Sequence, residues 1–271
     1  MLLSFIYNKI VYMIIMSWLL QYPSEKNYIN SIKKHFDEKN LENVRKDKNI
    51  QSIFEGVREN QGYEYARKIP QNWLNKNLSE IHKNEIFFKP EQTINIEGFS
   101  ISPTSLRYAW NCYEIGFYLP INSTSNIVEI GAGYGGLCRM LCGLNNISTY
   151  TIIDIPEVSL LAKKYNENYN INVVDLSCFD YKNYINHKYD IFISNYALSE
   201  LDKKEQDGYL SIASKTPYGY ITYNSQPKNK HLQYSKEEMK NIISNNRNIQ
   251  FICHNENITR SENEMIIWCT V

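Results

Sequence analysis

The chain has 271 residues, of which 43% are hydrophobic, so it is long enough to bury a sizeable core. Its 29 lysines and arginines balance its 29 aspartates and glutamates, which argues against a nucleic-acid or other polyanionic partner, because such partners need a basic face. The six cysteines form no C-x-x-C motif, which favours reduced, buried thiols in a cytoplasmic protein over disulfides or a metal site.

Residues 1–22 are largely apolar, but their longest uninterrupted apolar run, residues 10–20, is short for a bilayer-spanning helix. No small-residue cleavage site follows it. We expect a helix packed on the domain or a translation start at Met13 or Met16. A membrane anchor is the alternative, so membrane association is not expected but stays open through this segment alone.

Residues 1–100 are expected to form a helical extension, or cap, that precedes the main domain. Ser24 is typical of a helix N-cap, and Gly56 and Gly62 are expected to break a second helical stretch. The tyrosines within residues 61–65 favour packing against the core, and lining a substrate cleft is the alternative.

Residues 85–101 alternate between polar and apolar side chains, which predicts short strands or an irregular connection. A new helix is expected after them, with Ser102 as its N-cap and Pro103 at its first position. Arg107 and Tyr108 lie near its start. They are candidates for contact with a bound cofactor, and the alternative is a surface ion pair and a core aromatic.

The stretch IVEIGAGYGGLCR, residues 127–139, is the point around which residues 101–271, the main domain, are organised. A short apolar run is followed at once by four glycines, and apolar residues then recur at helical spacing, which is typical of a strand, a tight turn and a helix. The backbone of such a turn can approach a ligand with no Cβ in the way, and unpaired N–H groups of the helix start face the same place. The pattern predicts a nucleotide-like ligand.

Strands and helices alternate after this turn. Further strands are expected at residues 150–154, 171–175, 190–195, 219–224, 248–253 and 265–270. Alternation with helices implies a parallel, doubly wound sheet, whereas the last two strands have no helix between them and imply an antiparallel hairpin at one edge. We therefore predict an α/β fold with a seven-stranded, Rossmann-like sheet.

Polar residues follow several of these strands. Asp154, Asp175 and Asn195 fall at expected carboxyl ends, which is where open α/β sheets bind their ligands. For each acid the alternative is that it caps the helix that follows.

The glycines in residues 131–136, with Asp154 about twenty residues later, match the G-x-G-x-x-G dinucleotide fingerprint. The fingerprint alone leaves a nicotinamide enzyme and an S-adenosylmethionine (SAM) enzyme open. Two features favour SAM. Glu129 is expected on the first strand, just ahead of the glycines, where a cationic amino acid or sulfonium fits better than a pyrophosphate, and the terminal hairpin suits a seven-stranded sheet with one reversed strand.

Three stretches, EIGAGYGG (129–136), YTIIDIPEV (150–158) and DIFISNYALSEL (190–201), occur in this order. Together they resemble the class I SAM-dependent methyltransferases, and within these the sugar O-methyltransferases found with surface-polysaccharide genes. Residues 102–108, SPTSLRY, are similar to a segment that precedes the first motif in that group. The resemblance covers about residue 102 to the C-terminus.

The resemblance implies a SAM pocket built on the glycine turn. The backbone at Gly131 and Gly133 would pack against the methionine part of SAM, and Glu129 would hold its ammonium group. Asp154 would accept both ribose hydroxyls, since a carboxylate offers two acceptors.

The resemblance also implies roles for the residues at the other expected strand ends. Asp175, or the N–H of Leu176, would meet the adenine. Asn195 and Tyr196 would lie under the sulfonium, where the acceptor enters.

Methyl transfer to an alcohol benefits from a general base. His231, in the loop after the fifth strand, and Glu200, after the fourth, are the two candidates, although a lone histidine in a polar loop is often merely solvated. No cluster has convincing metal-ligand spacing.

The sequence thus predicts a SAM-dependent O-methyltransferase whose acceptor is a sugar, nucleotide-sugar or glycan. The alternatives are an NAD(P)-dependent sugar-modifying oxidoreductase and a methyltransferase-like partner subunit without catalysis.

Overall fold

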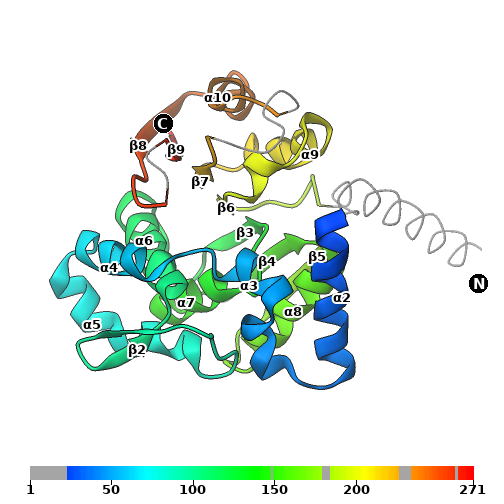
Figure 1. Ribbon diagram of the computed structural model, residues 1–271. Coiled ribbons are helices and arrows are strands. Elements are labelled where there is room, and N and C mark those ends of the chain that lie inside the picture. Colours follow the sequence, from blue (N-terminus) through cyan, green and yellow to red (C-terminus); the bar gives the residue numbers. More distant parts are fainter. Residues whose placement is uncertain (1–22, 148, 179–183, 226–232, 260–261) are drawn as a thin grey trace, which may run out of the picture.

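The structure is a computed structural model that describes residues 23–147, 149–178, 184–225, 233–259 and 262–271 (Figure 1). The expectations for residues 1–22 and for His231 lie outside the described residues. Within the described part of the chain, no helix has the length and apolarity needed to cross a membrane.

A seven-stranded sheet forms the centre of the molecule, with the strand order β5-β4-β3-β6-β7-β9-β8 (Figure 1). Its strands are β3 (Asn126–Ile130), β4 (Thr149–Asp154), β5 (Val173–Ser177), β6 (Ile191–Asn195), β7 (Tyr218–Tyr223), β8 (Ile249–Asn255) and β9 (Glu264–Thr270). Only β9 runs antiparallel to its neighbours; the other pairs are parallel. The order confirms the predicted Rossmann-like sheet and its C-terminal hairpin, and it places the switch point between β3 and β6.

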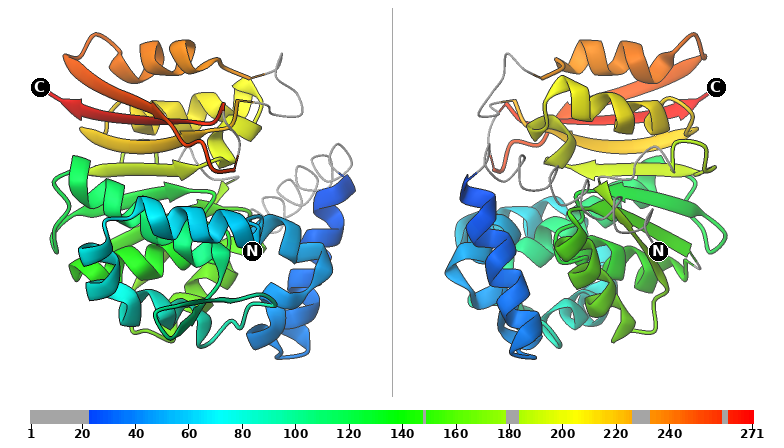
Figure 2. Two further views of the ribbon diagram at one scale, coloured as in Figure 1. Left: turned by 60° about the vertical axis from the view of Figure 1, so that its left-hand side comes forward. Right: turned by 90° about the vertical axis from the view of Figure 1, so that its right-hand side faces the viewer.

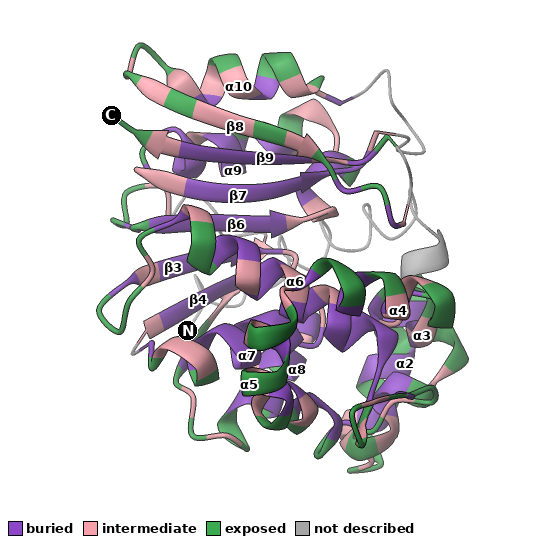
Figure 3. Ribbon diagram, turned by 90° about the vertical axis from the view of Figure 1, so that its left-hand side faces the viewer, coloured by how far each residue is buried: buried purple, intermediate pink, exposed green. Residues whose placement is uncertain are grey.

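Helices cover both faces of the sheet, so the inner strands are almost wholly apolar and buried (Figures 2 and 3). One face is covered by α6 (Pro103–Tyr118), α7 (Gly136–Asn145) and α8 (Pro156–Glu167). The other is covered by α9 (Lys203–Ala213) and α10 (Lys236–Ser244). Because side chains alternate along a strand, Ile127 enters the first apolar cluster and Val128 the second.

The N-terminal region is helical, as predicted, and packs on the first face. Its elements are α2 (Pro23–Asp37), η1 (Leu41–Lys46), α3 (Lys48–Phe54), α4 (Glu59–Lys68), α5 (Gln71–His82), η2 (Lys83–Glu85) and a hairpin of β1 (Ile94–Ile96) and β2 (Phe99–Ile101). A single apolar cluster continues from these helices into α6, α7 and α8. The division into a cap and a main domain at residue 100 stays a prediction.

Two local expectations for this region are wrong. Helix α2 already begins at Pro23, so Ser24 is inside the helix; proline is favoured in a first helical turn. Gly56 does separate α3 from α4, but Gly62 lies within α4. A Cβ at Gly62 would come within 2.9 Å of the Pro103 side chain, so this glycine permits close packing of α4 on α6 rather than breaking a helix.

The side chain of Arg45 is fully buried and joins the N-terminal region to the main domain. It forms ion pairs with Glu55 and Glu85. It also donates to the Ser102 hydroxyl at 2.8 Å, and that hydroxyl accepts the Ser105 N–H at 3.1 Å, which confirms Ser102 as the N-cap of α6.

We expect Arg45→Met to lower the free energy of unfolding by about 3–5 kcal/mol, because Glu55 and Glu85 would then be buried without their cation. Urea denaturation measures the effect. Lys34→Ala, which removes an exposed partner of Glu38, is the control and should change stability by less than about 1 kcal/mol. Equal changes in the two variants would refute the role of Arg45.

Candidate functional site

The glycine turn follows β3 and leads into α7, as predicted. Gly131, Gly133 and Gly135 have φ values of +73°, +57° and +85°, a region that glycine adopts without steric cost. A Cβ on Gly131 would lie 2.1 Å from the Cβ of Ala197, which follows β6. The turn therefore closes tightly against the end of β6, and only glycine fits there.

Asp154 ends β4 and binds the glycine turn directly. Its carboxylate accepts the N–H of Gly133 at 3.2 Å and of Ile155 at 2.7 Å. It does not cap α8, whose N-cap is Ile155. Burial raises the pKa of Asp154 to about 7, although these N–H groups favour its charged form.

Glu129 lies on β3 immediately ahead of the turn and is only 2% exposed. The Tyr150 hydroxyl donates to its carboxylate at 2.8 Å. Burial raises the pKa of Glu129 to about 8, and the charge of Asp154 acts in the same direction. Two carboxyl groups that resist ionisation therefore flank the glycine turn.

Helices of the N-terminal region cover this turn. Phe54 of α3 would lie 3.3 Å from a Cβ on Gly133, and its ring packs edge-on against Tyr28 of α2 at 5.7 Å between centroids. The charge of Asp154 also contributes to a raised pKa of Tyr28, after burial. The N-terminal helices thus bring aromatic rings to the glycine turn and to the end of β4.

The expectation that Asp175 ends a strand is wrong. Strand β5 continues to Ser177, and it is Ser177 that lies beside Asp154. Asp175 sits in mid-strand and pairs with Lys163 of α8 at 2.6 Å. Leu176 packs toward the cluster on the opposite face. Hydrophobic periodicity locates a strand but not its last residue, and the pairing of β5 with β4 extends through two further residues.

Asn195 ends β6, as predicted, and its amide is fixed in one orientation. Its Oδ1 accepts from Asn111 of α6 at 3.2 Å and from Thr222 of β7 at 2.8 Å. Its Nδ2 is buried and has no hydrogen-bond partner. The next residue, Tyr196, has φ +67° and ψ −38°, which a side chain of this size rarely adopts. Such strain concentrates at functional sites.

Arg107 and Tyr108 meet these strand ends from the first turns of α6. The Arg107 guanidinium lies 5.3 Å from the ring centroid of Tyr196 and 5.8 Å from that of Tyr108. Across the described residues Arg107 makes no ion pair. Tyr108 is buried in the core, and burial raises its pKa to about 12.

Glu200, one of the two candidate bases, is exposed at the end of the short helix η4 (Ala197–Glu200) that follows Tyr196. It accepts the Asn224 amide at 3.2 Å.

Residues of the β8–β9 connection complete this region and were not predicted. Glu256 accepts the hydroxyls of Tyr65 and Thr259, and Thr259 also bonds the Tyr196 hydroxyl at 3.0 Å. Tyr65 and Glu256 are 191 residues apart, so no local pattern connects them.

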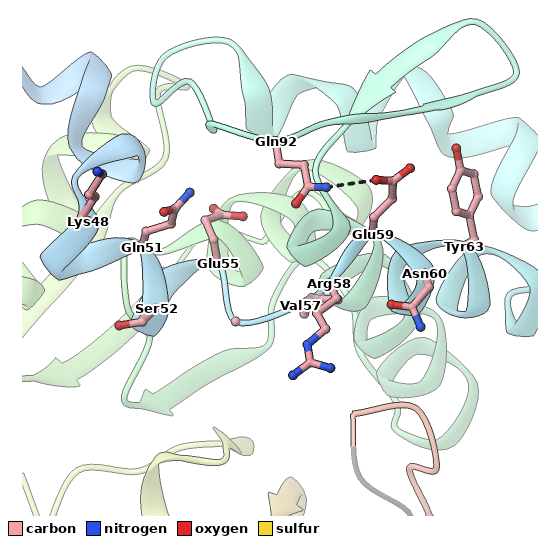
Figure 4. Close-up of a pocket in the computed structure, with 11 residues that line it drawn as sticks. Lys48, Gln51, Ser52, Glu55, Val57, Arg58, Glu59, Asn60, Tyr63 and Gln92 are labelled. Carbon is pink, nitrogen blue, oxygen red and sulfur yellow. Dashed lines mark hydrogen bonds between the residues drawn. The ribbon is translucent and has the colours of Figure 1, made fainter.

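A cavity of about 950 Å³ lies at the α3–α4 connection, away from every predicted site residue (Figure 4). Polar side chains line most of it. Lys48, Gln51 and Glu55 lie on one side of the α3–α4 connection, and Arg58 lies on the other. Tyr65 is buried in the core, and Tyr63, which lines this cavity, also packs against the core, so core packing holds for both tyrosines.

Within the described residues, no group of three or more His, Cys, Asp or Glu side chains is arranged to hold a metal ion.

No family model and no curated protein matches the chain. Among solved structures, the methyltransferase domain of bacterial CtHen1-C is similar over 60% of this chain and 96% of its own, at 10% identity and a TM-score of 0.45. Geranyl diphosphate C-methyltransferase from Streptomyces coelicolor A3(2) is similar over 63% and 81%, at 11% identity and a TM-score of 0.48. Magnesium protoporphyrin IX methyltransferase from Synechocystis PCC 6803 is similar over 78% and 91%, at 14% identity and a TM-score of 0.46. The strand order of the sheet is that of the class I methyltransferase fold.

The buried carboxyl of Glu129 predicts a loss of stability as pH rises. Between about pH 4.5, where an ordinary glutamate ionises, and about pH 8, the native state keeps a proton that the unfolded state has lost. Unfolding free energy should therefore fall over this range, and Glu129→Gln should reduce the fall by on the order of a few kcal/mol. Glu167→Gln, which alters an exposed pair with Lys164, is the control. A profile unchanged by Glu129→Gln in urea titrations would contradict the assignment.

Proposed function

We propose that this protein is a SAM-dependent O-methyltransferase that methylates a sugar hydroxyl in glycan biosynthesis. The observation that supports it best is the unit formed by the glycine turn and Asp154 at the carboxyl edge of a seven-stranded sheet with one reversed strand. All six cysteines are free, in keeping with the cytoplasm as its location.

The chemistry of the residues fits SAM. Asp154 offers carboxylate oxygens for the two ribose hydroxyls, and the backbone at Gly131 and Gly133 would pack against the methionine part. Glu129 resists ionisation because it is buried without a cation, so an ammonium or sulfonium brought beside it would favour its charged form. A pyrophosphate next to these two carboxyl groups would instead disfavour their charged forms further.

The acceptor would enter beside Asn195 and Tyr196. SAM supplies a methyl group on a sulfonium that needs no further activation, so the protein contributes mainly alignment of the two substrates. Glu200 follows the strained Tyr196 by one short helix, which supports it as a base that removes the hydroxyl proton. His231 is retained as the alternative base on its sequence position alone.

The helices of residues 1–100 would act as a cap over the cofactor, and residues 101–271 as the methyltransferase domain. A sugar acceptor is supported by the resemblance of residues 102–271.

We expect Asp154→Ala to weaken binding of S-adenosylhomocysteine (SAH) by about 10- to 100-fold, since hydrogen bonds to a charged group contribute about 1.5–3 kcal/mol. Isothermal titration calorimetry measures the affinity. Asp175→Ala is the matched control, because its carboxylate is engaged with Lys163, and its affinity should stay within about threefold of the wild type. Unchanged affinity in Asp154→Ala would show that the ribose assignment is wrong.

The activity itself is tested by incubating the protein with SAM carrying a labelled methyl group and a panel of nucleotide-sugars and oligosaccharides. We expect label to enter at least one sugar at a hydroxyl, as located by mass spectrometry and NMR. Binding of NAD(H) without any calorimetric or thermal-shift response to SAM or SAH would overturn the proposal.

A further inference from the structure

We propose that Arg107 binds a carboxylate group of the methyl acceptor, so that the acceptor is an acidic sugar of the uronic-acid type. This inference rests on the proposed function and narrows its substrate class. It concerns the space between the start of α6, the end of β6 and the β8–β9 connection.

The Arg107 guanidinium is held among aromatic rings and has no anion beside it. It lies against Tyr196 and Tyr108, and within the part of the chain that the structure describes no carboxylate comes within ion-pair distance of it. Its Nε is buried without a hydrogen-bond acceptor. Contacts of a cation with aromatic rings offset only part of the cost of removing a charge from water. A ligand anion would offset that cost.

The carboxylate whose charge acts on Arg107, Glu256, is already engaged. One of its oxygens accepts the Tyr65 hydroxyl. The other accepts the N–H of Thr259 at 3.0 Å and its hydroxyl at 2.6 Å. Glu256 therefore holds the β8–β9 connection in place and leaves the guanidinium unpaired.

A second unpaired donor lies at the end of β6, on the residue before Tyr196. Asn111 follows Arg107 by four residues on α6, so the two side chains share one face of the helix. Asn111 donates to Asn195, whose own Nδ2 is buried and lacks a partner. Arg107 and Asn195 thus both require an acceptor. A carboxylate is negatively charged and offers only hydrogen-bond acceptors, which suits both groups. A hydroxyl would bring no charge to Arg107 and carries a donor of its own.

The methionine carboxylate of SAM has the same chemistry, but the positions favour the acceptor. Of the groups proposed for the methionine end, Glu129 lies on β3 and the glycine turn follows that strand. Arg107 instead lies against Tyr196, which follows β6, where the acceptor would enter. If the carboxylate belongs to SAM, Arg107→Met should lower the affinity for SAH. If it belongs to the acceptor, the same substitution should remove the preference for an acidic acceptor instead.

The test compares methyl glucuronide with methyl glucoside, which differ by one carboxylate, in calorimetric titrations of the SAH-loaded protein. We expect the glucuronide to bind at least about 10-fold more tightly, and Arg107→Met to remove this preference while SAH affinity stays within about threefold. Arg107→Lys, which keeps the charge, should retain part of the preference. Arg67→Met, an exposed arginine on α4, is the control and should leave both affinities unchanged.

Each other outcome overturns the inference. Equal binding of the two glycosides by the wild type, or binding of neither up to millimolar concentration, would show that no acceptor carboxylate is recognised. A large loss of SAH affinity in Arg107→Met would assign Arg107 to the cofactor. Failure of the wild type to bind SAH at all would refute the proposed function itself, and is therefore distinguishable from failure of this inference.

Discussion

The buried guanidinium of Arg45 is the interaction on which the arrangement of this molecule depends. Its anionic partners are the C-cap residue of α3 and a residue of η2, and it also donates to Ser102, the cap of α6. It also lies 4.5 Å from the ring centroid of Tyr134, inside the glycine turn. A charge this deeply buried is tolerated only when its partners are held in place. The helices that cover the turn and the turn itself are therefore mutually dependent parts of one structure.

A second buried arginine extends this dependence to α7. Arg139 pairs with Glu80 of α5 at 2.6 Å and donates to Asn84, whose amide reaches the Gly136 carbonyl at 3.1 Å. The first turn of α7 is thus held from outside by polar contacts, while its apolar face packs on the sheet. The N–H groups at the start of this helix are consequently fixed in place, which reduces the ordering cost that a ligand would otherwise meet.

Much of the fold could be predicted from the sequence because helices cover both faces of the sheet. Inner strands must then be short, almost wholly apolar runs, and β3 to β7 are easy to recognise between their glycine and polar boundaries. Strand ends were less certain, as Asp175 shows, because pairing with a neighbour decides where a strand stops. The prediction that Gly62 breaks a helix was wrong for a related reason. The absence of a side chain at Gly62 permits close contact with Pro103, which is distant in sequence.

The candidate site, like the fold, has parts that sequence patterns predict and parts that they do not. Glu129, Gly131, Gly133 and Asp154 are close in sequence to strand ends, so their grouping follows from topology alone. The contact of Tyr65 with Glu256 joins an N-terminal helix to the terminal hairpin, and no spacing rule anticipates it. The part of the site around the glycine turn was therefore predictable, whereas the contact between Tyr65 and Glu256 required the structure.

The strained backbone of Tyr196 connects these two parts of the site. Its N–H donates to the Thr222 carbonyl at 3.0 Å and its hydroxyl meets Thr259, so neighbouring strands hold the residue in its unusual conformation. Asn195 beside it is fixed by Asn111, which belongs to a polar chain that also includes Tyr220 and Glu114. Strain persists only where the surroundings over-determine it. The rigid frame at the end of β6 thus presents unpaired donors in fixed positions, which is the arrangement that substrate alignment demands.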